Sequence, residues 1–314
     1  NVILKHCSIL KNVGMNVFII NSDKVNDNII NNDGEIEVIS NVTSKIDAKI
    51  DVMVASLWAT LDYVKKYPKV LEKAYLVQNF ETDFMKYGDY GKIIANSTYS
   101  YDDIKYITIS KWCQNWLENK YERKVSFIRN GINLNQFPYK ERKFNKKIKI
   151  LVEGNSDDYY KNVDESFKIV EKLDKSKYEI QFLSYQGKPK NWYYVDKFMH
   201  RVPYDQVGKV YQDADILIKS SILESFSYPP LEMMATGGVC VVVPNDGNIE
   251  YLKDEENCLF YEKGNIDQAV QQIERLSNDK KLRDHLIKEG IKTAKSRNWK
   301  EIEKEIVEVY VGNK

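Results

Sequence analysis

The chain has 314 residues, 43% hydrophobic and 30% charged, which is long enough for two globular domains of about 100–200 residues each. Its 47 basic and 46 acidic side chains leave a net charge of +1, which argues against a nucleic-acid-binding protein. No apolar run approaches the roughly 18 residues that span a bilayer, and the first residues lack a signal-peptide pattern, so we expect a cytoplasmic protein.

The first half of the sequence alternates helical patterns with short apolar strands. The apolar residues of 1–14 recur at helical spacing, which predicts a helix, and Gly14 stands where a glycine in the left-handed conformation would end it. Because the chain starts inside this helix and without Met, we expect the strand and loop that normally precede such a helix to be missing from this sequence. The pattern then predicts strands at 16–22, 51–56, 74–80, 105–110 and 125–130, and helices at 57–68 and 111–121.

A polar, charged stretch at 138–147 has the composition of a linker, and the alternation restarts after it. The order predicts an α/β protein with two doubly wound, Rossmann-like parallel-sheet domains. We place them at 1–140, truncated at its start, and at 146–314, with the last helix packing back on the first domain. Strands are expected at 147–154, 178–185, 215–221 and 239–244, and helices at 162–174, 204–212, 230–237, 266–289 and 299–310.

The segment 223–238, LESFSYPPLEMMATGG, lies between two apolar runs that resemble buried strands. Its double proline favours the first turn of a helix, so we expect a helix from there to Thr236, with Glu232 in its first turn. Glu224 would then lie in the loop at the carboxyl end of the preceding strand. In open parallel sheets, ligands bind at that end of the strands.

Two interpretations of this segment remain open from the residues alone. Backbone N–H groups at a helix start attract phosphate or sugar oxygens, and a carboxylate can accept hydrogen bonds from both hydroxyls of a diol. Glu224 and Glu232 are therefore candidates for binding the hydroxyls of two sugars that are joined by a diphosphate. The alternative is that Glu232 is a favourable acid near a helix N-terminus and Glu224 a solvated loop residue.

At this point the sequence resembles a known family. The run 214–250 is similar to the signature region of retaining glycosyltransferases of family 4, whose two Rossmann-like domains form the arrangement called GT-B. LVEGNSDDYYKNVDE resembles the strand-glycine-loop-lysine segment of that family, RNGINLNQF its turn before the linker, and SRNW its C-terminal tryptophan motif. LVQNFETDF is also similar to a segment of bacterial rhamnosyltransferases that build cell-surface glycans.

The resemblance implies roles for the matching residues. Glu224 would contact hydroxyls of the donor sugar and Glu232 the ribose hydroxyls of the nucleotide. Lys161 would contact the diphosphate, where its ammonium neutralises charge on the leaving group. Gly247 and Glu250 match the loop after the next strand, which closes over the donor in relatives; the alternative is an ordinary turn with an exposed acid. Further donor contacts are implied for Gly154, Ser225, Phe226, Ser227, Gly247 and Glu250.

One position departs from the family pattern. The family usually carries an arginine directly after the glycine of the strand-glycine segment, whereas Asn155 follows Gly154 here. One of two expected phosphate cations is therefore absent at that position. Lys219, close to Glu224 in sequence, is a candidate substitute, although a strand lysine that reaches solvent is the simpler interpretation.

Metal and aromatic candidates have simpler explanations. Asp213 and Asp215 have the D-x-D spacing of a metal site, but they occupy a stretch that is structural in family 4. The resemblance therefore implies a metal-independent enzyme that needs no cofactor besides its nucleotide-sugar substrate. Trp112 and Trp116, four residues apart on one helix face, are more often core than a sugar-stacking platform.

We expect a retaining glycosyltransferase that moves a hexose or deoxyhexose from a nucleotide-diphosphate sugar to a cell-surface glycan or a lipid-linked precursor. Two alternatives stay open: a nucleotide-sugar epimerase, for which no acid-base pair is evident, and a non-catalytic glycosyltransferase-like partner subunit. A lipid-linked acceptor is compatible with peripheral contact at the inner face of a membrane through Lys65, Lys66 and Lys69. A solvated helix face is the simpler interpretation of these lysines.

Overall fold

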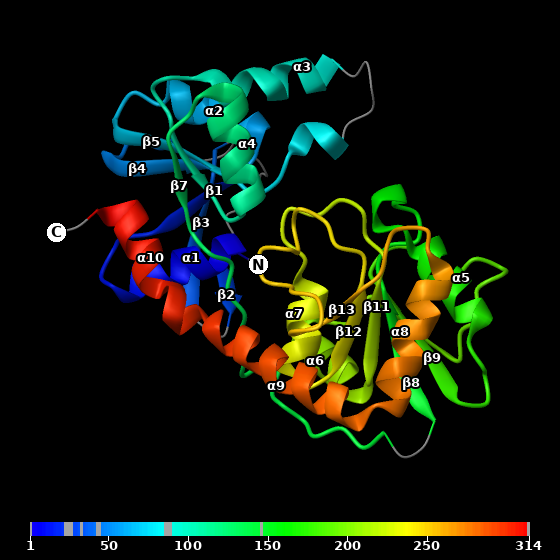
Figure 1. Ribbon diagram of the computed structural model, residues 1–314. Helices are drawn as coiled ribbons and strands as arrows, with labels where there is room; N and C mark the ends of the chain where they lie inside the picture. Colours follow the sequence, from blue (N-terminus) through cyan, green and yellow to red (C-terminus); the bar gives the residue numbers. More distant parts are fainter. Residues whose placement is uncertain are drawn as a thin grey trace. The chain divides into compact units, whose positions relative to one another are not determined.

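The computed structural model describes residues 2–21, 28–31, 34–41, 45–84, 90–144 and 147–312. The chain divides into two compact units, one made of Asn1–Asn130 with Lys300–Lys314 and the other of Gly131–Trp299 (Figure 1). Both units are built from parallel strands connected by helices, as expected from the alternating pattern. Among the described residues, no helix is both long enough and apolar enough to cross a lipid bilayer.

The first unit contains a parallel sheet in the order β4-β5-β6-β7 and a smaller sheet in the order β1-β3-β2, in which β2 runs antiparallel. The strands are β1 (Phe18–Asn21), β2 (Ile29–Asn31), β3 (Gly34–Ser40), β4 (Ile50–Ala55), β5 (Val70–Val77), β6 (Lys105–Thr108) and β7 (Val125–Phe127). The helices are α1 (Val2–Asn12), α2 (Trp58–Lys66), α3 (Tyr90–Ser97), α4 (Lys111–Tyr121) and α10 (Trp299–Val311).

Side-chain contacts hold α10 to the strands and helices of the first unit. The Tyr310 hydroxyl lies 3.2 Å from Nδ1 of His6, and Nζ of Lys105 donates to the Val309 carbonyl at 2.7 Å. His6 is buried, and this burial lowers its pKa to about 4. A neutral imidazole therefore belongs to the packing of α1 against α10.

The tryptophans of α4 belong to the packing of the first unit. Trp112 and Trp116 both meet the buried ring of Phe80 edge-on, with centroid distances of 4.0 and 3.9 Å. The structure therefore supports the core interpretation of this pair. Strands β2 and β3 and helix α3 were not predicted, because β2 and β3 lie in a stretch rich in Asn and Asp whose composition is typical of turns.

The second unit is built on a six-stranded, entirely parallel sheet in the order β10-β9-β8-β11-β12-β13. Its strands are β8 (Ile148–Glu153), β9 (Tyr178–Ser184), β10 (Lys197–His200), β11 (Ile216–Lys219), β12 (Val239–Val242) and β13 (Leu259–Phe260). Its helices are α5 (Val163–Lys172), α6 (Tyr204–Asp213), α7 (Tyr228–Ala235), α8 (Ile266–Asn278) and α9 (Lys280–Ser296).

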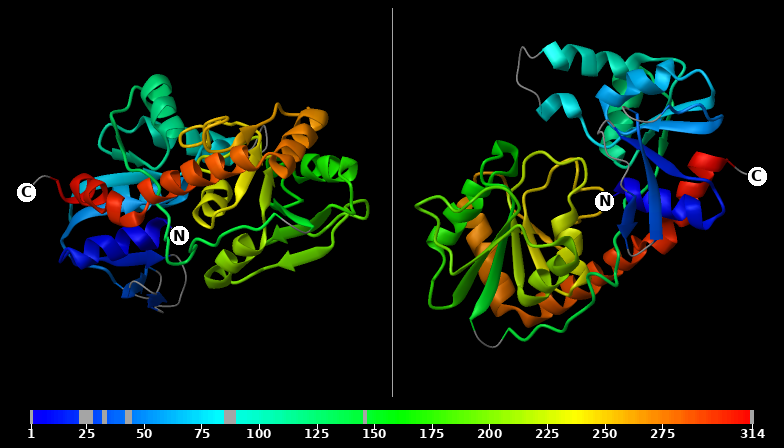
Figure 2. Two further views of the ribbon diagram at one scale, coloured as in Figure 1. Left: turned by 60° about the horizontal axis from the view of Figure 1, so that its bottom comes forward. Right: turned by 180° about the vertical axis from the view of Figure 1, so that it is seen from behind.

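Alternate residues of the central strands enter two different hydrophobic cores. Ile150 and Ile218 pack with α5 and α8 on one face of the sheet, whereas Leu151 and Leu217 pack with α6 and α7 on the other. Figure 2 shows these helices on both faces of the sheet. Since both faces are covered, the strands read as continuous apolar runs rather than as alternating ones.

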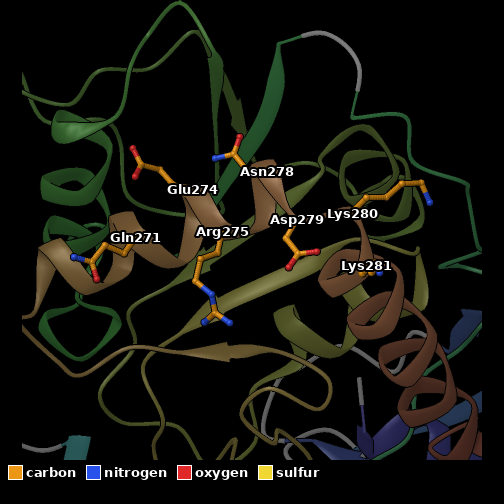
Figure 3. A pocket seen from close by; sticks show the side chains of 7 residues that line it. All are labelled: Gln271, Glu274, Arg275, Asn278, Asp279, Lys280 and Lys281. Atoms are coloured by element: carbon orange, nitrogen blue, oxygen red, sulfur yellow. The ribbon is translucent and has the colours of Figure 1, made fainter.

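Two predicted helix boundaries in this unit are wrong. The single helix expected at 266–289 is interrupted at Asp279, whose carboxylate accepts a hydrogen bond from the Leu282 N–H at 3.0 Å and caps α9 (Figure 3). Helix α7 begins at Tyr228, so Glu232 lies one turn inside it and not in its first turn. The prolines occupy the second and third helical positions, where a missing N–H still has no helical partner.

The cap at Asp279 gives a stability prediction. Replacing Asp279 by Ala leaves the first N–H groups of α9 without their side-chain acceptor, so we expect the free energy of unfolding to fall by about 1 kcal/mol. Asp284→Ala is the matched control, because it removes an exposed carboxylate of the same helix that pairs with Lys280. That change should cost less than about 0.5 kcal/mol in urea unfolding. Equal losses for the two variants would contradict the capping role.

Candidate functional site

A cavity of about 690 Å³ opens at the carboxyl edge of the second unit's sheet. Glu153 at the end of β8, Ser184 at the end of β9 and Lys219 at the end of β11 line it, together with the start of α7. After β8 the chain adds β9 and β10 on one side and then β11 on the other, so the strand order reverses between β8 and β11. Ligands of open α/β sheets bind at such a switch point, and the volume suits a small molecule.

Two lysines and two glutamates meet at this switch point. The ammonium of Lys161 donates to both carboxylate oxygens of Glu224, at 2.9 and 3.0 Å. Nζ of Lys219 lies 2.5 Å from Oε2 of Glu153 and 3.8 Å from Oε1 of Glu224. We call these four residues the charge cluster. The side chain of Lys219 is 1% exposed and that of Glu224 is 10% exposed, so neither is a solvated surface group.

A tight turn after β8 delivers Lys161 to the cluster. Gly154 has φ of +150°, and a Cβ there would lie 2.9 Å from Cγ2 of Val163, so only glycine suits this turn. Asn162 adopts the left-handed conformation with φ of 49°, and its amide donates to the Ser220 carbonyl at 3.2 Å. This bond ties the start of α5 to the end of β11. Lys161 therefore reaches Glu224 from a fixed backbone.

The charge of Lys161 is maintained by its neighbours. Its burial alone lowers the pKa, but the carboxylates of Glu224 and Glu153 outweigh that effect, so the pKa of Lys161 lies above its usual range. The side chain remains partly open, at 25% exposure, and it lines the cavity. A permanent cation at the rim of a cavity at helix N-termini favours an anionic ligand.

Glu232 lies at the same cavity, one helical turn inside α7. The buried hydroxyl of Tyr211, from α6, interacts with its carboxylate. The pKa of Glu232 is raised from 4.5 to about 7: burial is the main cause, the Tyr211 hydroxyl opposes it, and the charge of Glu153 adds to the rise. A carboxylate that is this poorly solvated gains from a ligand that supplies two hydroxyl donors.

The loop between Glu224 and α7 is supported from below by aromatic and charged side chains. Phe226, which also lines the cavity, packs against Tyr251 with a centroid distance of 5.2 Å, and the guanidinium of Arg297 lies 5.3 Å from the Phe226 ring. The Ser227 carbonyl accepts a hydrogen bond from the Tyr251 hydroxyl. These contacts fix the backbone from which Glu224 projects.

Gly247 and Glu250 belong to this support. The Gly247 carbonyl accepts from the Ser227 N–H at 3.2 Å, and a Cβ at Gly247 would lie 2.0 Å from the Glu224 carbonyl oxygen. Glu250 forms an ion pair with Arg297 at 2.7 Å, and both side chains are 8% exposed. Glu250 is therefore a buried pairing partner of Arg297, not an exposed acid.

The structure brings Lys161, Glu224, Phe226 and Glu232 to one cavity. Lys219 joins them, so its interpretation as a strand lysine reaching solvent is wrong. Asn155 is not among the lining residues, and its amide donates to Oε1 of Gln186 at 3.3 Å. Several lining residues that lie at strand ends or on α6 were not singled out from the sequence, because no local motif marks them: Glu153, Ser184, Arg201, Tyr204 and Tyr211.

The D-x-D pair lies at the other end of the sheet. Asp213 pairs with Lys149 at 2.5 Å, and Oδ2 of Asp215 accepts from the Lys149 N–H at 2.9 Å. Lys149 is near the start of β8, whereas Glu153 at the end of that strand lines the cavity. These aspartates are therefore structural. In the described part of the chain, no three His, Cys, Asp or Glu side chains are grouped so that they could hold a metal ion.

Comparison with known proteins shows which family part of the chain resembles. Residues 196–293 match the family model described as "Glycosyl transferases group 1", a stretch that includes both Glu224 and Glu232. This part of the second unit is therefore similar to the glycosyl transferases group 1 family. The chain is 26% identical to MJ1607 and 25% identical to MJ1178, two uncharacterized glycosyltransferases of Methanocaldococcus jannaschii. It covers 64% and 59% of those two proteins, so it spans less than two thirds of their length, and 71% and 66% of this chain are aligned.

Solved structures show the same fold at low identity. A sucrose-phosphate synthase from Thermosynechococcus elongatus superposes with a TM-score of 0.80 at 13% identity, over 98% of this chain and 92% of that one. WaaG, a glycosyltransferase involved in lipopolysaccharide biosynthesis, gives 0.72 at 12% identity, over 99% and 95%. HepE of Anabaena, solved with UDP-glucose, gives 0.67 at 12%, over 82% and 78%. The chain has the GT-B fold of two Rossmann-like domains.

Burial of Glu232 predicts a pH-dependent stability. The unfolded chain releases this proton near pH 4.5 and the folded protein near pH 7, so the folded state holds an extra proton between these values. Its stabilising contribution is complete below pH 4.5 and is lost as the pH rises through 7. Glu232→Gln cannot lose a proton, so its free energy of unfolding relative to wild type should rise by about 2 kcal/mol or more between pH 4.5 and 8.

Chemical unfolding at both pH values measures this difference. Glu171→Gln, on the exposed side of α5, is the control and should show no such trend. A Glu232→Gln variant whose stability follows that of wild type at both pH values would contradict the burial effect.

The close approach at Gly247 gives a second prediction for the site. Gly247→Ala places a methyl group 2.0 Å from the Glu224 carbonyl, so the loop that carries Glu224 must move. We expect a loss of about 2 kcal/mol in the free energy of unfolding, in the range of overpacked positions. Gly264→Ala is the control, because its positive φ of +84° carries a strain cost of about 1 kcal/mol with open space around it. A smaller loss at 247 than at 264 would be evidence against this packing.

Proposed function

We propose that this chain is the donor-binding and catalytic part of a retaining, metal-independent glycosyltransferase of the family 4 type. The observation that carries the proposal is the meeting of Lys161, Glu224 and Glu232 in one cavity at the strand switch point. The match of residues 196–293 to the group 1 model supports it independently of this geometry.

The cavity offers complementary groups for each part of a nucleotide-diphosphate sugar. Glu232 would accept hydrogen bonds from the ribose hydroxyls, and Lys161 would bind the diphosphate. Glu224 would accept hydrogen bonds from hydroxyls of the transferred sugar, and the loop at Ser225 and Phe226 would supply backbone N–H donors. The Ser184 hydroxyl is buried beside the cavity and has no hydrogen-bond partner within the described chain.

The proposed reaction breaks the bond between the anomeric carbon and the diphosphate oxygen and forms a bond from that carbon to the acceptor oxygen. The bonding electrons leave with the diphosphate, whose growing charge the ammonium of Lys161 stabilises. The acceptor proton passes to an oxygen of the leaving diphosphate on the same face of the sugar. This geometry retains the anomeric configuration and requires neither a metal nor a cofactor.

The donor class we propose is a hexose or deoxyhexose carried on UDP, GDP or dTDP. The acceptor we propose is a cell-surface glycan or its lipid-linked precursor, made at the cytoplasmic face of a membrane with peripheral contact. Among structures of this fold, HepE was solved with UDP-glucose, and WaaG is involved in lipopolysaccharide biosynthesis. These two neighbours support a nucleotide sugar as the donor and a surface glycan or its precursor as the acceptor.

Calorimetric titration with UDP, GDP and dTDP, and with UDP-glucose and dTDP-rhamnose, tests the proposal. We expect one nucleotide to bind preferentially in the presence of EDTA. Glu232→Ala should weaken it roughly 10-fold to 150-fold, since hydrogen bonds to a charged group contribute about 1.5–3 kcal/mol. Glu171→Ala, which removes an exposed glutamate of the same unit, should bind as wild type does.

The outcomes separate the alternatives. Absence of binding to all three nucleotides by a folded protein would overturn the proposal and favour a non-catalytic subunit. If Glu232→Ala left the binding unchanged, the nucleotide would not bind beside Glu232 in this cavity. Conversion of the donor sugar without any acceptor would indicate an epimerase.

A further inference from the structure

We propose that Lys219 is a standby cation for Glu224: it keeps this carboxylate ionised when Lys161 leaves it to bind the diphosphate. The inference rests on the proposed function, because the exchange is driven by an anionic donor. Lys219 would be a positioning residue, since it acts on Glu224 and does not itself touch the donor.

The free site has Lys161 in a contact that competes with ligand binding. Its ammonium is held by both oxygens of Glu224, at 2.9 and 3.0 Å. To bind a diphosphate, this ammonium must direct its donors away from Glu224. The side chain of Glu224 is only 10% exposed, so its ionised form is destabilised by desolvation if no other cation is near when Lys161 moves away.

Lys219 is placed to take over this pairing. Its Nζ lies 3.8 Å from Oε1 of Glu224, which is the oxygen that Lys161 contacts at 2.9 Å. Two of its three N–H donors are directed to Glu153, at 2.5 Å to Oε2 and 3.3 Å to the carbonyl oxygen. One donor therefore remains for Glu224. A small approach of the two groups would complete a hydrogen bond as Lys161 withdraws.

The burial of Lys219 also indicates this role rather than direct contact with phosphate. Its side chain is 1% exposed, beneath the rim where Lys161 is 25% exposed. A charged lysine that is buried this deeply requires a carboxylate partner. Lys219 pairs with Glu153 at 2.5 Å and has Glu224 as a second carboxylate at 3.8 Å.

The charged and titratable groups that face the exchange come from every element around it. Lys161 and Tyr160 face Glu224 from the turn before α5, Tyr251 faces it from the loop after β12, and Glu153 faces Lys219 from β8. Glu232 of α7 interacts electrostatically with both Glu153 and Lys219. Because the pKa of Glu232 is about 7, the exchange is best measured at pH 8, where Glu232 is mostly ionised in the wild-type protein.

Proton uptake on ligand binding is the first readout, and a purely structural lysine would not change it. Titration with UDP, or with GDP or dTDP if these bind instead, is carried out at pH 8 in phosphate and in Tris, whose ionisation enthalpies differ. The test protein is the double variant Glu153→Gln with Lys219→Met, which removes the buried pair without leaving either charge alone. We expect it to take up about one more proton per bound nucleotide than wild type, on Glu224.

Matched variants control for other effects of the change. Lys219→Arg retains a cation and should take up no additional proton. Lys149→Met removes a strand lysine at the opposite end of β8 and should also match wild type. Equal proton uptake by the double variant and wild type, with nucleotide still bound, would overturn the inference and leave the proposed function intact. Absence of nucleotide binding by wild type would overturn the proposed function itself.

A second measurement needs no change to the buried lysine. In Lys161→Met, Lys219 is the cation left beside Glu224, so ¹³C-carboxyl NMR should show Glu224 still ionised between pH 6 and 8. The signal is assigned by its loss in Lys161→Met with Glu224→Gln. A protonated Glu224 in this variant would overturn the inference even if the double variant fails to fold.

Discussion

The burial of charge at the reversal of strand order is the constraint on which the site depends. The strand order reverses between β8 and β11, and in open parallel sheets backbone and side chains at the carboxyl ends of such strands can approach a ligand. Glu153, Lys161, Lys219 and Glu224 fill this place with two charges of each sign. Each charge in such a cluster is tolerable only because the others are present, so the loops that carry them have to be rigid.

The supporting structure follows from that need for rigidity. Gly154, Asn162 and Gly247 adopt conformations or contacts that a larger side chain would disturb, and each lies next to a residue of the charge cluster or its loop. The buried pair of Arg297 and Glu250 supports the same loop from the other side. These residues determine where the reactive groups lie without being reactive themselves.

The parts of the site found from sequence are those carried by short contiguous patterns. Glu224 and Glu232 flank a double proline, which made them candidates with a structural alternative left open. The roles expected of these two residues and of Lys161 came from the resemblance of short contiguous segments to a known family. Glu153 and Tyr211 belong to no such pattern, since their roles arise from strand pairing and helix packing between distant segments. Lys219 was misjudged for the same reason: a strand in a sheet covered on both faces has no solvent side. The helix boundary at Asp279 depended on a capping contact that composition alone does not fix, whereas α7 begins at Tyr228 without a side-chain cap.

The division of the chain has a consequence for biosynthesis. The first unit takes its early strands and helices from residues up to Asn130 but completes its packing with α10, which follows the whole second unit in sequence. On the ribosome, Lys105, Arg129 and His6 emerge long before Val309, Glu305 and Tyr310, the residues they contact. The first unit therefore cannot complete its packing against α10 until the residues of the second unit have been synthesised. In this protein the order of synthesis is not the order in which the units are finished.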